Sequence, residues 1–200
     1  MPEHEIVFRI DEPVVLIGTA ALLLWLCGER LLQFFGLHQP KAERREPFWW
    51  YCWHALVFYG ALVFSLLDAA MWHWTTVGPA LGSVRWVGVP LVVAGVVVRL
   101  VSRLALGKQF SPQVQTAREH RLITTGIYRS IRHPAYLGYL CLLLGIPLSL
   151  GSVAGFASGL AAVATILYRI PVEEAALASW FPDEYRRYQA RTHKLIPGLW

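Results

Sequence analysis

The chain has 200 residues, of which 56% are hydrophobic and only 16% are charged, and its mean hydropathy is +0.44. Soluble domains contain roughly 45–50% apolar and about 25% charged residues, so this composition excludes both a free soluble domain and a disordered chain. The net charge of +5 would also suit nucleic acid, but a chain this apolar uses its basic groups near anionic lipid headgroups. We therefore expect a membrane protein that binds membrane lipid and no nucleic acid.

Three apolar stretches in the first half of the chain are long enough to cross a bilayer, for which roughly 20 apolar helical residues are needed. The first covers residues 13–28 and can extend toward residue 35, the second covers 48–71, and the third covers 84–106. Asp68 is the only formally charged residue of the second stretch, and we expect it at the end of that span away from the cytoplasm. Tryptophans near both ends of this stretch predict interfacial belts: Trp49, Trp50, Trp53, Trp72 and Trp74.

The strongest apolar signal is residues 135–168, which are 34 residues without Asp, Glu, Lys, Arg or His. This run is too long for one upright span, and it is interrupted at Gly145-Ile146-Pro147 and at Leu150-Gly151-Ser152. It predicts a tight hairpin of two short helices, roughly 135–149 and 153–170. The fold class is therefore an all-α, polytopic membrane helix bundle with about five transmembrane helices.

The distribution of basic residues predicts the orientation of the bundle. Fourteen of the 18 Lys and Arg residues follow the first, third or fifth span, whereas Arg99 and Arg103 lie near the end of the third span, where long side chains can reach the headgroups. By the positive-inside rule, the N-terminus lies outside and the C-terminus in the cytoplasm. Acidic residues ahead of the first span argue against a cleaved signal peptide. We expect one integrated domain, in which residues 1–106 supply three spans and residues 107–200 supply a cytoplasmic loop, the hairpin and a cytoplasmic tail.

The end of the polar insert predicts a loop that closes onto the start of a helix. Thr125-Gly126 is a turn signal, His133 is pushed out of the helical region by the next residue, and Pro134 suits a first helical turn. Free backbone N–H groups at such a start, beside Arg132 and His133, suit a carboxylate or phosphate of a ligand. The alternative is a segment that binds lipid headgroups and only starts a helix.

Four sequence blocks follow one another from here to the end of the chain. They are Leu122-Ile123-Thr124-Thr125-Gly126-Ile127-Tyr128, then Arg132-His133-Pro134-Ala135-Tyr136-Leu137-Gly138, then Arg169 with Glu173-Glu174 after the apolar hairpin, and finally Phe181, Tyr185, Tyr188 and Ile196-Pro197-Gly198. Their order and spacing resemble the isoprenylcysteine carboxyl methyltransferase and phospholipid methyltransferase superfamily over roughly residues 107–198. One departure is Pro182, which stands where we expect glycine and which predicts the first residue of a last helix.

The resemblance implies that the chain binds S-adenosylmethionine at its cytoplasmic face. Carried over position by position, it implies that the cofactor is contacted by Gln113, Gln115, His120, Leu122, Gly126, Tyr128, Arg132, His133, Pro134, Tyr136 and Glu174. The matches of Gln113 and Gln115 are the weakest. The seven histidines are scattered along the sequence without an HxxxH pair, so we expect no metal site.

Arg169 and Glu173 are the candidate catalytic residues, because side chains four residues apart share a face if the fifth span continues as a helix. Arg169 suits a bidentate contact with the carboxylate of a methyl acceptor. An amine acceptor would first have to lose a proton, and Glu173 or Glu174 would then be the candidate base. In the plainer interpretation, Arg169 anchors the span at the headgroups and Glu173 is its ion-pair partner.

The expected function is transfer of a methyl group from S-adenosylmethionine to the carboxylate of an isoprenylcysteine-like lipophilic acceptor. The acceptor would be a lipophilic small molecule or a lipidated peptide. Three alternatives stay open: a phosphatidylethanolamine N-methyltransferase, an NADPH-dependent oxidoreductase of the sterol-reductase type, and a non-catalytic lipid-binding protein. The sequence leaves the oligomeric state open.

Overall fold

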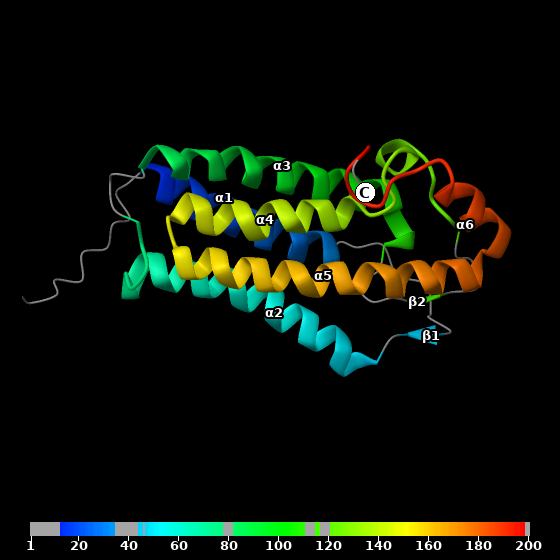
Figure 1. Cartoon of the computed structure of the whole chain (residues 1–200), viewed down its shortest axis with the longest axis horizontal. Helices are drawn as coiled ribbons and strands as arrows, with labels where there is room; N and C mark the ends of the chain where they lie inside the picture. Colours follow the sequence, from blue (N-terminus) through cyan, green and yellow to red (C-terminus); the bar gives the residue numbers. More distant parts are fainter. Residues whose placement is uncertain are drawn as a thin grey trace, which may run out of the picture.

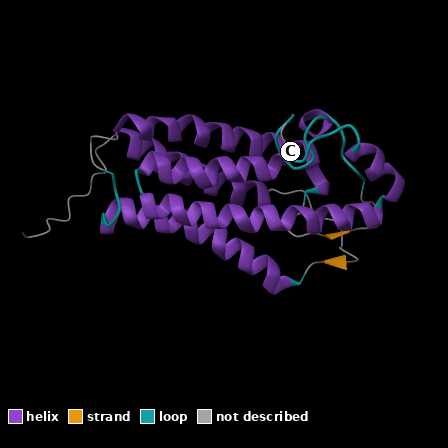
Figure 2. Ribbon diagram, viewed as in Figure 1, coloured by secondary structure: helices purple, strands orange, loops and turns teal. Residues whose placement is uncertain are grey.

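A computed structural model describes residues 13–34, 44–45, 47–77, 82–110, 115–116 and 121–198. Within these ranges the chain forms six α-helices, five of which lie side by side in an elongated bundle, while the sixth is set off at one end (Figure 1). The helices are α1 (Pro13–Phe34), α2 (Phe48–Leu67), α3 (Gly82–Leu106), α4 (Pro134–Leu150), α5 (Val153–Trp180) and α6 (Pro182–Gln189). At the same end as α6, two short strands pair antiparallel (Figure 2): β1 (Arg44–Arg45) and β2 (Gln115–Thr116).

Three of the described helices are long and apolar enough to cross a membrane: Phe48–Trp72, which is α2 with a following π-helical turn η2 (Asp68–Trp72), together with α3 and α5. Two shorter apolar helices accompany them, Leu16–Gly28 within α1 and the whole of α4. Large apolar side chains are exposed on the outer faces of the bundle, among them Leu24, Leu56 and Leu104. Such faces are expected where lipid rather than water surrounds the helices.

The predicted apolar spans match the observed helices closely in the first half of the chain. The first arm and the turn of the hairpin are confirmed: α4 covers Pro134–Leu150 without a break at Gly145-Ile146-Pro147, and Gly151, with φ +72°, follows it. The second arm is not short: α5 continues past residue 170 to Trp180. The polar residues in this extension bond to other parts of the chain, so they prolong the helix instead of ending it.

Helices α3 and α4 are held in close contact by facing glycines. A Cβ atom on Gly95 would lie 2.9 Å from the carbonyl oxygen of Gly138, and one on Gly88 would lie 2.5 Å from the carbonyl oxygen of Gly145. Small residues let two helix backbones approach this closely, as is common in membrane bundles. The contact fixes the start of α4 beside the end of α3, and the polar loop between them is thereby placed at one end of the bundle.

Asp68 closes the opposite end of the bundle. Its buried carboxylate accepts hydrogen bonds from the backbone N–H groups of Trp74 (3.1 Å) and Thr75 (3.3 Å), and from the hydroxyl groups of Thr75 (2.7 Å) and Ser152. Ser152 lies in the turn between α4 and α5. The carboxylate therefore ties the end of α2 to that turn, far from the polar loop.

Candidate active site

The loop before α4 adopts the turn and the helix start that the sequence predicts. Gly126 has φ +59°, a conformation that favours glycine, and it begins the 3₁₀ turn η5 (Gly126–Arg129). His133 is non-helical (φ −123°) and precedes Pro134, which occupies the first turn of α4. Pro182 likewise begins α6, as expected from its position.

The tail after α6 pairs with this loop through the backbone. The N–H group of His193 donates to the carbonyl of Ser130 (3.0 Å), that of Arg132 donates to His193 (2.8 Å), and that of His133 donates to Lys194 (3.0 Å). The amides of Arg132 and His133 are thus bonded to the tail. The tail, and not the loop alone, determines how these two side chains are presented.

Side-chain contacts strengthen the pairing of loop and tail. The Nη1 atom of Arg132 donates to the carbonyl oxygens of Gln189 (3.3 Å) and Thr192. The hydroxyl group of Tyr188, in α6, donates to the carbonyl oxygen of Tyr128 (2.6 Å). Loop, α6 and tail therefore form one unit at this end of the bundle, which we call the loop–tail unit (residues 121–133 and 182–198).

Glu174 of α5 joins the bundle to the loop–tail unit. Its Oε1 atom lies 2.7 Å from Nε of Arg132 and 3.3 Å from Nε2 of His133, and its Oε2 atom lies 3.8 Å from Nζ of Lys194. The carboxylate is buried, so each of these contacts is worth more than it would be in water. Glu174 therefore holds Arg132 and His133 in place.

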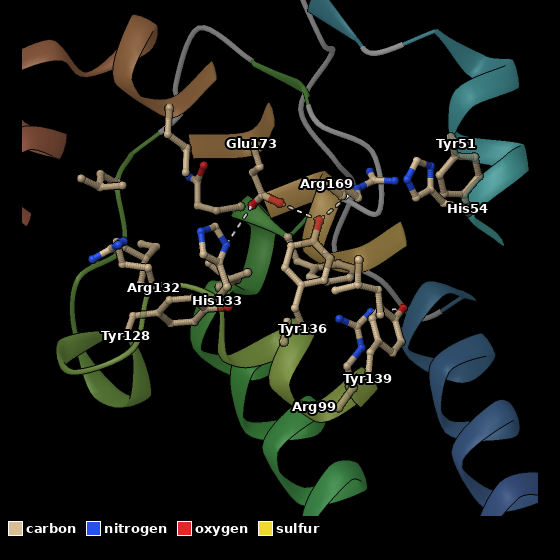
Figure 3. A pocket seen from close by; sticks show the side chains of 18 of the residues that line it. Tyr51, His54, Arg99, Tyr128, Arg132, His133, Tyr136, Tyr139, Arg169 and Glu173 are labelled. Carbon is tan, nitrogen blue, oxygen red and sulfur yellow. Dashed lines mark hydrogen bonds and ion pairs between the residues drawn. The ribbon is translucent and has the colours of Figure 1, made fainter. Parts of the chain in front are cut away.

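Glu173, the neighbouring residue, belongs to a second cluster, which has Tyr136 at its centre. The Tyr136 hydroxyl group donates to Oε2 of Glu173 (2.7 Å) and accepts from Nε of Arg169 (2.9 Å). Nδ1 of His133 lies 4.0 Å from the other oxygen of Glu173. Figure 3 shows this chain of contacts between α4 and α5. Arg169 and Glu173 share a helix face as predicted, and Tyr136 joins them.

A cavity of about 210 Å³ passes through this cluster. In Figure 3, Tyr128, Arg132 and His133 lie on one side of it and Tyr51 and His54 of α2 on the other, with Tyr136, Arg169 and Glu173 between them. Beyond Tyr51 and His54 the wall continues with the apolar rings of Phe58 and Tyr59 of α2 and with Ile166 of α5. The cavity thus joins the polar loop–tail unit to the interior of the membrane bundle.

Seven of the predicted site residues line this cavity: Leu122, Tyr128, Arg132, His133, Tyr136, Arg169 and Glu173. Three are described but are not among its lining residues: Glu174, which contacts Arg132, Pro134 at the start of α4, and Gly126 in η5. Gln113 and His120 lie outside the described residues. Gln115 lies in β2, and only its backbone is described.

Sequence reasoning missed a charged wall residue on α3. Arg99, expected at the headgroups, is instead buried, with its guanidinium 4.0 Å from the ring centre of Tyr139 and its Nη2 atom donating to that hydroxyl group (2.7 Å). Arg103 is buried as well and stacks on Phe110 (4.6 Å). The helical repeat could have indicated the burial of Arg99, because Arg99 follows Gly95 by four residues and so lies on the same buried face of α3.

Burial keeps the phenol groups of the loop–tail unit neutral. It raises the pKa of Tyr188 to about 12, although the positive charges of Arg132 and Arg191 oppose this shift. It also raises the pKa of Tyr128 and Tyr185 well above the ordinary value, with Glu173 and Glu174 respectively adding to the effect. Tyr185 is fully buried at the cavity wall, and its hydroxyl group makes no hydrogen bond within the described part of the chain. Such a hydroxyl group favours a polar ligand.

The fold and the cavity define a class of protein: a multi-pass, helical membrane protein with a cavity lined by charged side chains at one end of its bundle. Comparison with solved structures agrees. The structure of the eukaryotic intramembrane Ras methyltransferase ICMT (isoprenylcysteine carboxyl methyltransferase) matches with a TM-score of 0.57 and 26% identity, over 73% of this chain and 52% of that chain.

Sequence comparison identifies the family. The model of the isoprenylcysteine carboxyl methyltransferase (ICMT) family matches residues 86–179. The protein-S-isoprenylcysteine O-methyltransferase of Dictyostelium discoideum is 32% identical over 189 residues, which are 91% of this chain and 78% of that relative. A probable enzyme of the same name from Oryza sativa subsp. indica is 33% identical over 119 residues, covering 58% of this chain and 62% of its own length. The chain therefore belongs to the isoprenylcysteine carboxyl methyltransferase family.

Coverage of the relatives is partial. The human protein-S-isoprenylcysteine O-methyltransferase is 29% identical over 127 residues, which are 60% of this chain but 45% of the human protein. The chain likewise matches less than two thirds of the rice relative. The match to the family model begins at residue 86, so Tyr51 and His54 of the cavity wall lie outside it.

Proposed function

We propose that the chain is an integral membrane methyltransferase that moves a methyl group from S-adenosylmethionine to the carboxylate of an isoprenylcysteine-like lipophilic acceptor. The observation that carries this proposal is the hydrogen-bonded cluster of Arg169, Tyr136 and Glu173. It lies within a cavity that joins the polar loop–tail unit to the apolar bundle. A lipophilic substrate with one charged end fits such a cavity.

The residues of the loop–tail side fit S-adenosylmethionine, which supplies a methyl group activated by its sulfonium. The buried hydroxyl group of Tyr185 offers a hydrogen bond to a polar group of the ligand. The carboxylate of Glu173, at the cavity wall, suits a positively charged group of the ligand. Leu122 adds an apolar wall on this side. We propose that these residues, together with Tyr128, Arg132, His133 and Tyr136, hold the cofactor.

Arg169 holds the acceptor in this proposal. A carboxylate is ionised at neutral pH, so it needs no general base to accept a methyl group. Arginine binds carboxylates in a bidentate manner, and the bond from Nε of Arg169 to Tyr136 fixes the plane of its guanidinium. The protein's main task is then to align two reactants and to exclude water.

Amine methylation has less support as an alternative. A lipid ammonium group would need a base, and the two candidate carboxylates are already engaged: Glu174 by Arg132, His133 and Lys194, and Glu173 by Tyr136. The family membership likewise favours a methyltransferase over the reductase and lipid-binding alternatives.

We further propose that α1 and α4 also cross the bilayer, which makes five spans in one integrated domain. The close contact between α3 and α4 supports this, because it joins residues 1–106 to residues 107–200. The basic residues Arg121, Arg129, Arg186, Arg187 and Arg191 are exposed on the loop–tail unit. This supports a cytoplasmic site with the N-terminus outside, and an acceptor that enters from the membrane.

The first experiment is calorimetric titration of the detergent-purified protein with S-adenosylhomocysteine, repeated with NADPH. We expect S-adenosylhomocysteine alone to bind and its binding to be lost in the double variant Arg132→Ala, His133→Ala. Binding of NADPH alone, or of neither compound, would contradict the proposal.

The second experiment measures transfer of radiolabelled methyl groups to N-acetyl-S-farnesylcysteine and to phosphatidylethanolamine. We expect only the farnesylated acid to be methylated. Arg169→Ala should abolish ester formation while S-adenosylhomocysteine still binds. Arg187→Ala, an exposed arginine of α6, is the control and should leave both unchanged. Retained turnover in Arg169→Ala would exclude the role given to that residue.

A further inference from the structure

His54 is an ionisable side chain inside an apolar helix. It is the only Asp, Glu, Lys, Arg or His residue of α2 (FWWYCWHALVFYGALVFSLL). The residue is 8% exposed, its imidazole packs edge-on against Trp50 (4.6 Å between ring centres), and it lines the cavity. An ionisable group within a membrane helix is costly, and it is therefore a candidate for function.

The hydrogen bonding of His54 determines what it offers to the cavity. Its Nδ1 atom lies 2.8 Å from the carbonyl oxygen of Trp50. A carbonyl oxygen has no proton to give, so Nδ1 must carry the proton and donate it. In the neutral imidazole, Nε2 is then a hydrogen-bond acceptor. His54 thus presents an acceptor to the cavity in a fixed orientation.

The position of His54 indicates which of the two reactants its Nε2 atom contacts. Figure 3 shows His54 across the cavity from Arg132 and His133, with the side chain of Arg169 extending toward it from α5. If the loop–tail side holds the cofactor, the α2 side holds the methyl acceptor. A group that contacts both Arg169 and His54 must carry a carboxylate with a hydrogen-bond donor close to it.

We propose that Nε2 of His54 accepts a hydrogen bond from the amide N–H group adjacent to the acceptor's carboxylate. The site then selects N-acylated, lipidated cysteines over lipophilic thioether acids that lack the amide. This inference rests on the proposed function. His54 is a specificity residue in it, because the methyl group and the carboxylate react without its help.

Two acceptors that differ in one group test the inference. N-acetyl-S-farnesylcysteine carries the amide, whereas S-farnesyl-3-mercaptopropionate has hydrogen in its place. We expect the wild-type protein to prefer the amide-bearing acceptor by roughly ten-fold in kcat/KM, as the loss of one hydrogen bond predicts. His54→Leu should abolish this preference by slowing only the amide-bearing acceptor. His54→Gln, which keeps an acceptor atom, should retain part of it.

Phe58→Leu is the matched control, because Phe58 lines the same wall one helical turn further along and has no polar atom. It should change the rates of both acceptors by the same factor. Titration with S-adenosylhomocysteine shows whether each variant is folded.

The outcomes separate the inference from the proposed function. If the wild-type protein methylates both acceptors and His54→Leu slows both equally, or if the wild-type protein has no preference, the inference is wrong and the proposed function stands. If the wild-type protein methylates neither acceptor, both are wrong.

Discussion

The Tyr136 hydroxyl group has two partners of opposite charge. It donates a hydrogen bond to Glu173 and accepts one from Arg169. Removal of the hydroxyl group therefore takes one hydrogen bond from each of these two side chains. An unpaired polar group in a buried site costs about 1–3 kcal/mol. The guanidinium of Arg169 would then lose the orientation that a bidentate contact with a carboxylate requires.

We therefore predict that Tyr136→Phe lowers kcat/KM for a carboxylate acceptor by roughly 10- to 100-fold, which is the rate change that a loss of about 1–3 kcal/mol corresponds to. The affinity for S-adenosylhomocysteine should stay within about two-fold of wild type. Steady-state methylation and calorimetry measure the two quantities. Tyr139→Phe, which removes a hydroxyl group bonded to Arg99 on the same helix, is the control. Tyr136→Phe keeps the ring that lines the cofactor side of the cavity, so a large loss of S-adenosylhomocysteine affinity would show that the hydroxyl group itself contacts the cofactor.

The site residues that could be predicted are those of continuous motifs. Arg132, His133 and Tyr136 lie within five positions of one another, and Arg169 and Glu173 lie four apart on one helix, so local spacing alone brings them together. His54 and Arg99 could not be assigned to the site in this way. His54 is isolated in an apolar span, and the helical period places Arg99 only on the buried stripe of α3. The packing of α2 and α3 against α4 and α5 is needed to show that both residues face the cavity.

At the scale of helices, the α3–α4 contact depends on backbone approach. Gly95 is packed against Gly138 and Leu142, so a larger side chain must separate the two helices. Gly60, in α2, has no atom within 4 Å of the position its Cβ would take. The two glycines therefore form a matched pair for testing this contact.

We predict that Gly95→Leu destabilises the protein by about 1–3 kcal/mol or more, whereas Gly60→Leu changes stability by less than about 0.5 kcal/mol. The melting temperature of each variant in detergent, followed by circular dichroism, measures the difference. Each kcal/mol corresponds to about 2–4 °C in a chain of this size. Equal melting temperatures would mean that the two helices are not in close contact.

The pairing of α6 with the loop gives the site a dependence on alkaline pH. An ordinary tyrosine titrates near 10.0, whereas burial raises the pKa of Tyr188 to about 12. The unfolded chain therefore loses this proton first, and the stability that the neutral phenol contributes is complete below pH 10. It is lost as the pH rises from 10 through 12. The ionised group can no longer donate to the carbonyl oxygen of Tyr128.

We predict that binding of S-adenosylhomocysteine is constant up to about pH 10 and then falls as the loop–tail unit comes apart. Tyr188→Phe should bind more weakly below pH 10, because it lacks the hydrogen bond to Tyr128, but its binding should fall less steeply above that pH. Near-ultraviolet absorbance of tyrosinate follows the titration. An equally steep fall in both proteins would assign the effect to other groups.

The helix boundaries were largely predictable and the length of α5 was not. Long apolar runs with few charges mark where the chain can span the membrane, which suffices for α1, α2 and α3. Beyond residue 168 the run ends, but the helix does not, because Arg169, Glu173 and Glu174 are bonded to α4 and to the loop. Hydropathy measures how strongly a side chain prefers water. It does not show that a polar side chain can bond to another part of the protein instead of to water.

For the whole molecule, the basic residues predict one orientation in the membrane. The exposed arginines of the loop–tail unit lie at one end of the bundle, and Asp68 is buried at the other. We predict that a C-terminal green fluorescent protein fusion is fluorescent in a bacterial host, and that a C-terminal alkaline phosphatase fusion is inactive, because both reporters then remain in the cytoplasm. An active phosphatase fusion would reverse the orientation.

The pairing of residues 193 and 194 with residues 130, 132 and 133 has a consequence for biosynthesis. The ribosome delivers α1 to α5 to the membrane before it makes the segment that pairs with Arg132. The nascent bundle can therefore insert with its loop still open, and the proposed site is complete only after residues 193 and 194 emerge and fold back onto the loop. A chain whose synthesis stops within α6 would be an inserted membrane protein without a finished site.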